Sequence, residues 1–213
     1  MSSDRPSGAR SSEPEPTGVP AGRVKARGSE LLEALDRHLP SARDHADGTA
    51  AYAFAAAVEL DLGRDHAEAV RETARLHEVG NVYLPAAIVA KPRGALTPEE
   101  QALLESGFAR GAELARGAGI PEQASEWIGA IRERFDGNGP AGLAGERIPI
   151  ESRIMRVACA CDTALAAVAP SGTSQDERRQ MAVDALRAAA GSELDPRVTT
   201  ALAAMLERAA AAK

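Results

Sequence analysis

Residues 131–165, IRERFDGNGPAGLAGERIPIESRIMRVACACDTAL, join a loop rich in glycine and proline to a run whose apolar residues have helical spacing. Gly137, Gly139 and Gly142 satisfy the pattern GxGxxG, which in dinucleotide-binding folds lies between a strand and the helix that holds the pyrophosphate. Here a helix-forming segment precedes the glycines, and Pro140 interrupts them. We therefore interpret residues 136–150 as a connection between two helices and not as a dinucleotide site.

The chain on both sides of this stretch is also typical of helices separated by glycine and proline. Thr97 with Glu100, and Ser174 with Glu177, have the spacing of capping boxes, and Pro98 suits a first helical position. We expect helices over residues 30–38, 42–60, 65–78, 121–135 and 151–168, with others beginning near 97, 174 and 195. Because no segment alternates like a strand for more than a few residues, the sequence predicts an all-α bundle of about seven to eight helices.

Two regions differ in composition. Residues 1–27 are rich in Ser, Pro, Gly and Arg and contain almost no large apolar side chain. Such a segment cannot bury enough apolar surface to offset the entropy of ordering it. We therefore predict a disordered leader over residues 1–27 and one helical domain over residues 28–213.

The overall composition excludes several classes of protein. The 213 residues carry a formal net charge of −6, which argues against indiscriminate binding to nucleic acid or to an anionic membrane. No apolar run approaches the roughly 20 residues needed to span a bilayer, and the first residues lack the apolar core of a signal peptide. We expect a cytoplasmic protein. Cys159 and Cys161 would point apart on a helix, so we expect reduced thiols and no disulfide.

Two histidines are placed where a helical bundle holds a metal ion. His77 follows the inward face of the helix expected at residues 65–78 and is followed by Glu78, whereas His45 lies in the helix expected at residues 42–60. Inward histidines from two helices, one of them beside an acid, suit a metal site. A pair of hydrogen-bonded core histidines would produce the same pattern, and periodicity does not decide between the two.

Four segments resemble a known family in the same order. LHEVGNVYLP at residues 76–85 is similar to the LHDIGKIGIP segment of HD-GYP domains, a branch of the HD superfamily of metal-dependent phosphohydrolases. Residues 95–114, 131–165 and 191–198 resemble the following family segments in register. The resemblance covers roughly residues 30 to 206. It implies an HD-domain-like helical bundle and a phosphodiesterase that opens cyclic di-GMP with two or three metal ions, usually iron or manganese.

The metal ligands that the resemblance implies are only partly present. His45 and His77 match family histidines, Glu78 stands where the family has a bridging Asp, and Asp162 keeps the second acid of its helix. These four residues are the expected residual metal ligands. At the remaining positions the family residue is lost: Asn81 replaces a lysine, Gly107 a histidine, Ile131 and Arg132 the paired histidines, and Cys159 an aspartate.

Two arginines are candidates to bind a ligand. Arg153 resembles the arginine that precedes the family's VAD helix, and its guanidinium would suit a phosphate. A salt bridge from Arg153 to Asp162 or to a neighbouring acid explains the same residue equally well. Arg132 is the second candidate, and its positive charge would also oppose a metal dication placed nearby.

Three functions follow from this comparison. The first is a degenerate HD-GYP-like domain without metal cofactor or catalysis, which acts as a signalling or scaffolding module through a protein partner, alone or as a homodimer. The second is a residual metal-dependent phosphohydrolase or cyclic di-GMP phosphodiesterase that uses a single iron or manganese ion on His45, His77 and Glu78. The third is a sensor that binds a cyclic dinucleotide without hydrolysing it, with Arg153 and Arg132 on the phosphates.

Overall fold

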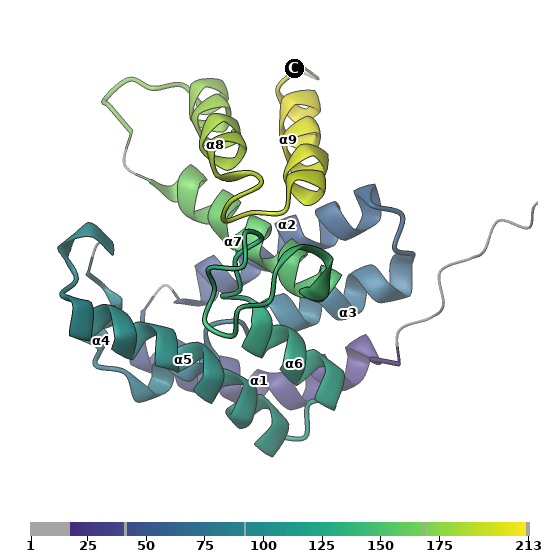
Figure 1. The fold of residues 1–213 in the computed structure, drawn as a ribbon, viewed down its shortest axis with the longest axis vertical. Coiled ribbons are helices and arrows are strands. Elements are labelled where there is room, and N and C mark those ends of the chain that lie inside the picture. Colours follow the sequence, from purple (N-terminus) through teal and green to yellow (C-terminus); the bar gives the residue numbers. More distant parts are fainter. Residues whose placement is uncertain (1–17, 41, 92, 168, 212–213) are drawn as a thin grey trace, which may run out of the picture.

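The computed structural model describes residues 18–211 with the exception of residues 41, 92 and 168, and the named elements in this part of the chain are all helices joined by loops (Figure 1). The prediction of an all-α fold is confirmed. The α-helices are α1 (Ala21–His38), α2 (Ala42–Glu59), α3 (Arg64–Ala74), α4 (Ala86–Val89), α5 (Pro98–Gly117), α6 (Glu122–Ala130), α7 (Ile150–Ala166), α8 (Gln175–Ala189) and α9 (Pro196–Ala211). Three short 3₁₀ turns complete the described part: η1 (Val79–Tyr83), η2 (Arg93–Ala95) and η3 (Gly145–Arg147).

The first helix begins earlier than the sequence predicts. Helix α1 starts at Ala21 and not near residue 30, and Val24 in its first turns is fully buried. Leu32 and Leu35 continue this apolar stripe about two and three turns further on. The predicted boundary at residue 27 is therefore wrong, because residues 21–27 belong to the packed domain. Residues 1–17 of the predicted leader lie outside the described residues.

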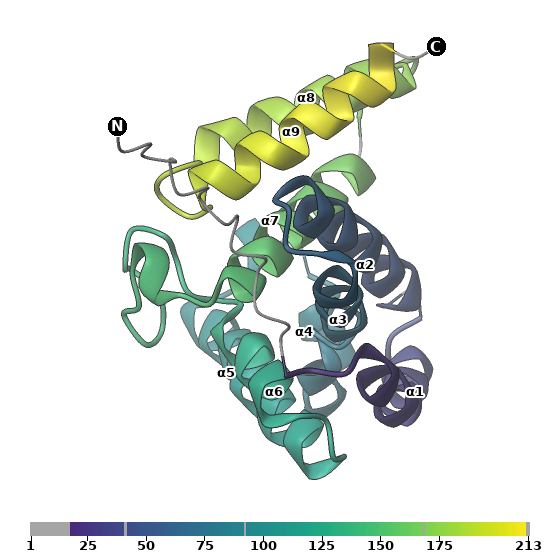
Figure 2. The ribbon, with the colours of Figure 1, turned by 90° about the vertical axis from the view of Figure 1, so that its right-hand side faces the viewer.

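Helix α7 lies at the centre of the molecule. It packs against α2 on one side and against α8 on another, while α2 in turn packs against α3. Helices α5 and α6 pack against each other, and η1 lies on α5. Helices α8 and α9 lie side by side as a hairpin on one end of the domain (Figures 1 and 2). No helix in the described part of the chain is both long enough and apolar enough to cross a membrane.

Small side chains bring α2 close to its neighbours. Ala53, Ala56 and Ala57 of α2 are fully buried, so that the backbones of adjacent helices approach over methyl groups. Larger apolar side chains fill the core elsewhere, and Trp127 of α6 and Ile154 of α7 are almost completely buried. The helical spacing of the apolar residues in the segment predicted as a helix over residues 121–135 agrees with this buried position of Trp127.

The connection between α6 and α7 is an ordered loop, as predicted. Helix α6 ends at Ala130 and not at Phe135, because Glu133 turns inward. The Glu133 carboxylate accepts hydrogen bonds from the backbone N–H groups of Ala141 at 2.7 Å and Leu143 at 2.9 Å. One buried carboxylate thus holds the glycine-rich segment in shape.

Candidate metal centre

Three potential metal donors converge from three elements. His45 comes from α2, His77 from the turn that follows α3, and Cys159 from α7. Their donor atoms all lie within 4.8 Å of one another. His45 Nε2 lies 3.6 Å from Cys159 Sγ, and the two imidazole rings meet edge to face with centroids 5.1 Å apart. Residues distant in the sequence thus form one compact group, which we call the His–His–Cys cluster.

His77 lies in a turn and not in a helix. The sequence predicts a helix to residue 78, but α3 ends at Ala74, and the His77 N–H donates to the Ala74 carbonyl at 3.2 Å. His77 Nδ1 donates to the same oxygen at 2.8 Å. Its Nε2 atom is buried and has no hydrogen-bond partner among the described residues. This nitrogen is therefore free to bind a metal ion.

The orientation of His45 is fixed by Asp162. His45 Nδ1 donates to Asp162 Oδ2 at 2.7 Å, which turns the opposite ring nitrogen toward Cys159. Asp162 follows Cys159 by one turn on α7, so this single helix supplies both the thiol and the carboxylate. The sequence suggested Asp162 as a ligand and Cys159 as a lost position. The structure places them otherwise: Cys159 belongs to the group of donors, and Asp162 holds His45 from behind.

The histidines and Cys159 shift one another's pKa values toward the charged forms. Burial alone would lower the pKa of His45, but its hydrogen bonds to Asp162 and Cys159 outweigh this effect and raise the pKa to about 10. Burial alone would raise the pKa of Cys159, but the positive charge of His77 and the hydrogen bond from His45 outweigh this effect and lower the pKa to about 6. Without a metal ion, Cys159 is therefore a thiolate beside a protonated imidazole at neutral pH.

Glu78 adds a carboxylate near the cluster. Its negative charge contributes to raising the pKa values of both His45 and His77. The side chain is partly buried, in the turn directly after His77. Glu78 therefore stands near the two histidines, as the sequence suggested, but it is not one of the three converging donors.

Two of the lost family positions have structural roles. Ile131 lies in the core and is only 2% exposed. Gly107 of α5 lies against η1, where a Cβ added at Gly80 would lie 1.7 Å from the Gly107 carbonyl oxygen. A Cβ at Gly107 would itself lie 3.2 Å from Oδ1 of the buried Asn81 and 3.0 Å from Leu84 Cδ1. Gly107 therefore serves close packing between η1 and α5.

The two candidate arginines occupy different surroundings. Arg153 pairs with buried Asp195 at 2.5 Å and donates through Nε to the Ile148 carbonyl at 2.9 Å. The salt-bridge interpretation therefore accounts for Arg153, with Asp195 as the partner and not Asp162. The Arg132 guanidinium lies over the Phe108 ring, 4.9 Å from its centroid.

A polar pocket of about 640 Å³ lies beside the glycine-rich loop. Its wall is formed by Gln101, Glu105, Arg132, Arg134, Asn138, Gly139, Pro140, Arg156 and Glu193. Arg156 precedes Cys159 by three residues, so both lie on the same side of α7. Three arginines against two glutamates give the wall a positive balance, although Arg156 pairs with Glu193 and Arg134 pairs with Asp136 and Glu193. Arg153 does not line this pocket.

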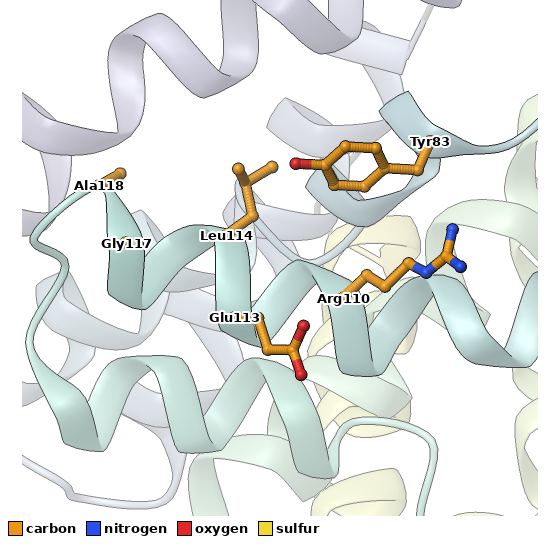
Figure 3. Close-up of a pocket in the computed structure, with 6 residues that line it drawn as sticks. All are labelled: Tyr83, Arg110, Glu113, Leu114, Gly117 and Ala118. Atoms are coloured by element: carbon orange, nitrogen blue, oxygen red, sulfur yellow. The ribbon is translucent and has the colours of Figure 1, made fainter.

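A second cavity, of about 610 Å³, lies along α5. It is lined by Tyr83, Arg110, Glu113, Leu114, Gly117 and Ala118 (Figure 3). The half-exposed Tyr83 ring points along α5 toward Leu114. Because no member of the His–His–Cys cluster lines this cavity, it is separate from the candidate metal centre.

The sequence matches the family model described as HD domain over residues 30–198, which is most of the chain. The chain belongs to the HD domain family. The resemblance stated from the motifs is thereby confirmed. Over 157 residues it is 33% identical to the cyclic di-GMP phosphodiesterase response regulator RpfG of Xanthomonas campestris pv. campestris (strain 8004), a match that covers 68% of this chain and 40% of that protein.

A second curated relative and two solved structures are also similar to this chain. A cyclic di-GMP phosphodiesterase of Vibrio cholerae serotype O1 is 31% identical over 150 residues, which are 66% of this chain and 30% of that protein. The HD domain thus spans less than half the length of these curated relatives. Among solved structures, the HDG"Y"P protein Bd1817 of Bdellovibrio bacteriovorus superposes with a TM-score of 0.65 at 19% identity, over 86% of this chain and 62% of that one. The HD domain of the L. monocytogenes phosphodiesterase PgpH in complex with cyclic-di-AMP superposes with a TM-score of 0.61 at 17% identity, over 84% and 96%.

The residues of this HD domain do not fit a centre of two or three metal ions. Two ions held in a fixed relation need about six to eight protein ligands. The described residues bring together one group of three donors, and positions 107, 131 and 132 supply none. The cluster does fit a single ion, because a buried nitrogen of His77 is otherwise left without a partner.

Proposed function

We propose that this HD domain is a phosphohydrolase whose centre works with one metal ion and whose substrates are phosphodiesters of the cyclic dinucleotide class. The observation that carries the proposal is the convergence of His45, His77 and Cys159 within 4.8 Å, with the charge of Glu78 beside them. The family relationship supports the reaction class, and the names of the curated relatives support the substrate class.

His45, His77 and Cys159 would hold the ion. A single bound ion supplies a Lewis acid for the phosphoryl oxygens and lowers the pKa of a bound water. The chain's own part is to fix the ligands: Asp162 holds His45, and the Ala74 carbonyl holds His77. Glu78 is the nearby carboxylate that would accept a proton from the attacking water.

The arginine-lined pocket is the place where the rest of the substrate would bind. Its volume of about 640 Å³ lies in the usual range for small-ligand sites. Arg132, Arg134 and Arg156 present guanidinium groups, which pair well with phosphate oxygens. No member of the His–His–Cys cluster lines this pocket, and Arg156 is the lining residue that stands one turn before Cys159 on α7.

A second function is favoured by one specific observation. Positions 107, 131 and 132 carry a packed glycine, a core isoleucine and an arginine stacked on Phe108, so the ligands of a second metal ion are missing there. A domain of this kind would bind a cyclic dinucleotide without turnover and pass the signal to a protein partner. The protein partner, the homodimer and the cytoplasmic location remain predictions.

Hydrolysis assays separate the two functions. The purified chain is loaded separately with Zn²⁺, Mn²⁺ and Fe²⁺, incubated with cyclic di-GMP, cyclic-di-AMP or 3'3'-cGAMP, and the linear products are measured by chromatography. We expect product with at least one ion, and none from His77→Ala. His38→Ala is the matched control, because His38 Nε2 donates to the Leu84 carbonyl at 2.7 Å and His38 is not a member of the cluster.

The alternative outcome has a distinct signature. Saturable binding of a cyclic dinucleotide in calorimetry, without any product under every metal condition, would overturn the phosphohydrolase and support the sensor. Equal turnover by the chain and by His77→Ala would overturn the assignment of the centre to this cluster.

A further inference from the structure

We infer that the His–His–Cys cluster selects one Zn²⁺ ion, bound through a thiolate, in place of the iron or manganese ions that the family resemblance implies. This inference rests on the proposed function in one respect only, since it names the ion of the same centre. The disagreement with the expected iron or manganese lies in the donors themselves. One of the three is a sulfur atom, which the described residues place beside two imidazole nitrogens.

The spacing of the donors suits a tetrahedral zinc ion. Zinc–nitrogen bonds of about 2.0–2.1 Å and zinc–sulfur bonds of about 2.3 Å put a nitrogen and a sulfur ligand about 3.6 Å apart in a tetrahedron. His45 Nε2 and Cys159 Sγ lie 3.6 Å apart. All the donor atoms fall within 4.8 Å, so that His77 needs only a small movement to complete the set.

Each histidine leaves Nε2 for the metal, and zinc binding would displace the proton that a protonated imidazole carries there. A neutral imidazole whose Nδ1–H is donated elsewhere has its Nε2 lone pair free for a metal. His45 donates to Asp162 and His77 donates to the Ala74 carbonyl, at 2.7 Å and 2.8 Å. The His77 Nε2 atom is buried without a partner in the described chain, which is costly unless something binds it. A zinc ion would remove that cost.

The chemical character of the donors decides between the ions. Thiolate is a soft ligand that suits zinc, whereas manganese prefers carboxylate and water oxygens. At a given set of nitrogen and sulfur donors, zinc also binds more tightly than manganese or iron(II). A cysteine at position 159, where the resembled family has an aspartate, therefore changes the preferred metal and does not merely weaken the site.

Cobalt substitution reads the thiolate bond without using activity. The metal-free chain is titrated with Co²⁺, and the near-ultraviolet band of a sulfur-to-cobalt charge transfer is recorded. We expect one equivalent of Co²⁺ to bind and to produce this band. We expect Zn²⁺, but not Mn²⁺, to displace the bound Co²⁺ at comparable concentrations. Cys159→Ser should lose the band and lower zinc affinity by on the order of 100-fold or more, since even the loss of a residue that only supports a ligand costs 10–100-fold. Cys161→Ala is the matched control, because Cys161 is buried on the same helix outside the cluster.

Each outcome bears on this inference or on the function separately. Cobalt binding without the band, or a band that survives in Cys159→Ser, overturns the inference. Hydrolysis with Mn²⁺ alone and no thiolate band also overturns the zinc inference and leaves the proposed function standing. The thiolate band without hydrolysis supports the zinc inference and overturns the proposed function. If Cys159→Ser fails to fold, X-ray absorption of the zinc-loaded chain replaces it, and the inference requires one sulfur neighbour at about 2.3 Å.

Discussion

Gly48 of α2 and Asp162 of α7 face each other so closely that a Cβ at position 48 would lie 2.1 Å from Asp162 Oδ1. Because Gly48 has no side chain, Asp162 of α7 can reach His45, which lies on α2 together with Gly48. One glycine thus links the packing of α2 on α7 to the geometry of the metal centre.

We predict that Gly48→Ala displaces Asp162 and weakens the fold. Overpacking at a helix contact lowers the free energy of unfolding by on the order of 1–3 kcal/mol, and zinc affinity should fall with it. Urea denaturation and zinc titration measure the two effects. Gly22→Ala in α1 is the control, because a Cβ there meets no atom within 4 Å, and it should raise stability by about 0.5–1 kcal/mol. Equal changes in stability and zinc affinity in Gly48→Ala and Gly22→Ala would contradict the close contact between Gly48 and Asp162.

Removing the charge behind His45 should loosen the metal without unfolding the chain. Asp162→Asn keeps the shape of the side chain and can still accept the Nδ1–H, but it loses the negative charge that raises the pKa of His45. We expect a 10–100-fold loss of zinc affinity and a lower pKa of His45, measured by competition with a chelator and by NMR titration. An unchanged affinity would show that Asp162 does not support the centre.

The thiol of Cys159 should react at unusually low pH in the metal-free chain. Its pKa of about 6 lies below the usual range for thiols, so alkylation should rise through pH 6, whereas the pKa of buried Cys161 is raised to about 12. Because the folded pKa is depressed, the linked stability is present above the unfolded pKa of about 8.5 and is lost as the pH falls through 6. Mass spectrometry after timed alkylation locates the label. Bound zinc should protect Cys159, and labelling of Cys161 first would refute the assignment.

Arg153 should matter for stability and not for metal binding. Arg153→Ala leaves Asp195 buried without its partner, and breaking such a pair costs about 3–5 kcal/mol. Thermal or urea unfolding measures this loss. Arg187→Ala removes the exposed pair with Glu207 and should change stability by less than about 1 kcal/mol. If Arg153→Ala were as stable as the control but bound cyclic dinucleotide poorly, Arg153 would be a ligand-binding residue after all.

Much of the fold could be predicted because local signals and motifs agree. The capping boxes at Thr97 and Ser174 are both formed, and the core position of Trp127 followed from helical spacing. The start of α1 could not be predicted, because Val24 stands alone among charged residues and glycines and is buried only by the rest of the domain. Local composition does not contain that contact.

The site was predicted only in part, for a physical reason. His45 and His77 stood out by position, but the direction of Cys159 depends on how α7 rotates against α2, which no local pattern records. The exchange of roles between Asp162 and Cys159 follows from that rotation. The signal that was available is the three-residue spacing between them, which places both on one side of a helix.

The metal content of the purified chain tests whether the His–His–Cys cluster holds one zinc ion. The full chain is expressed in medium supplemented with zinc, iron and manganese, and the bound metals are measured by mass spectrometry beside folded His77→Ala. We predict about one zinc ion per chain, absent in the variant. Two iron or manganese ions per chain, or no metal in the folded chain, would contradict it.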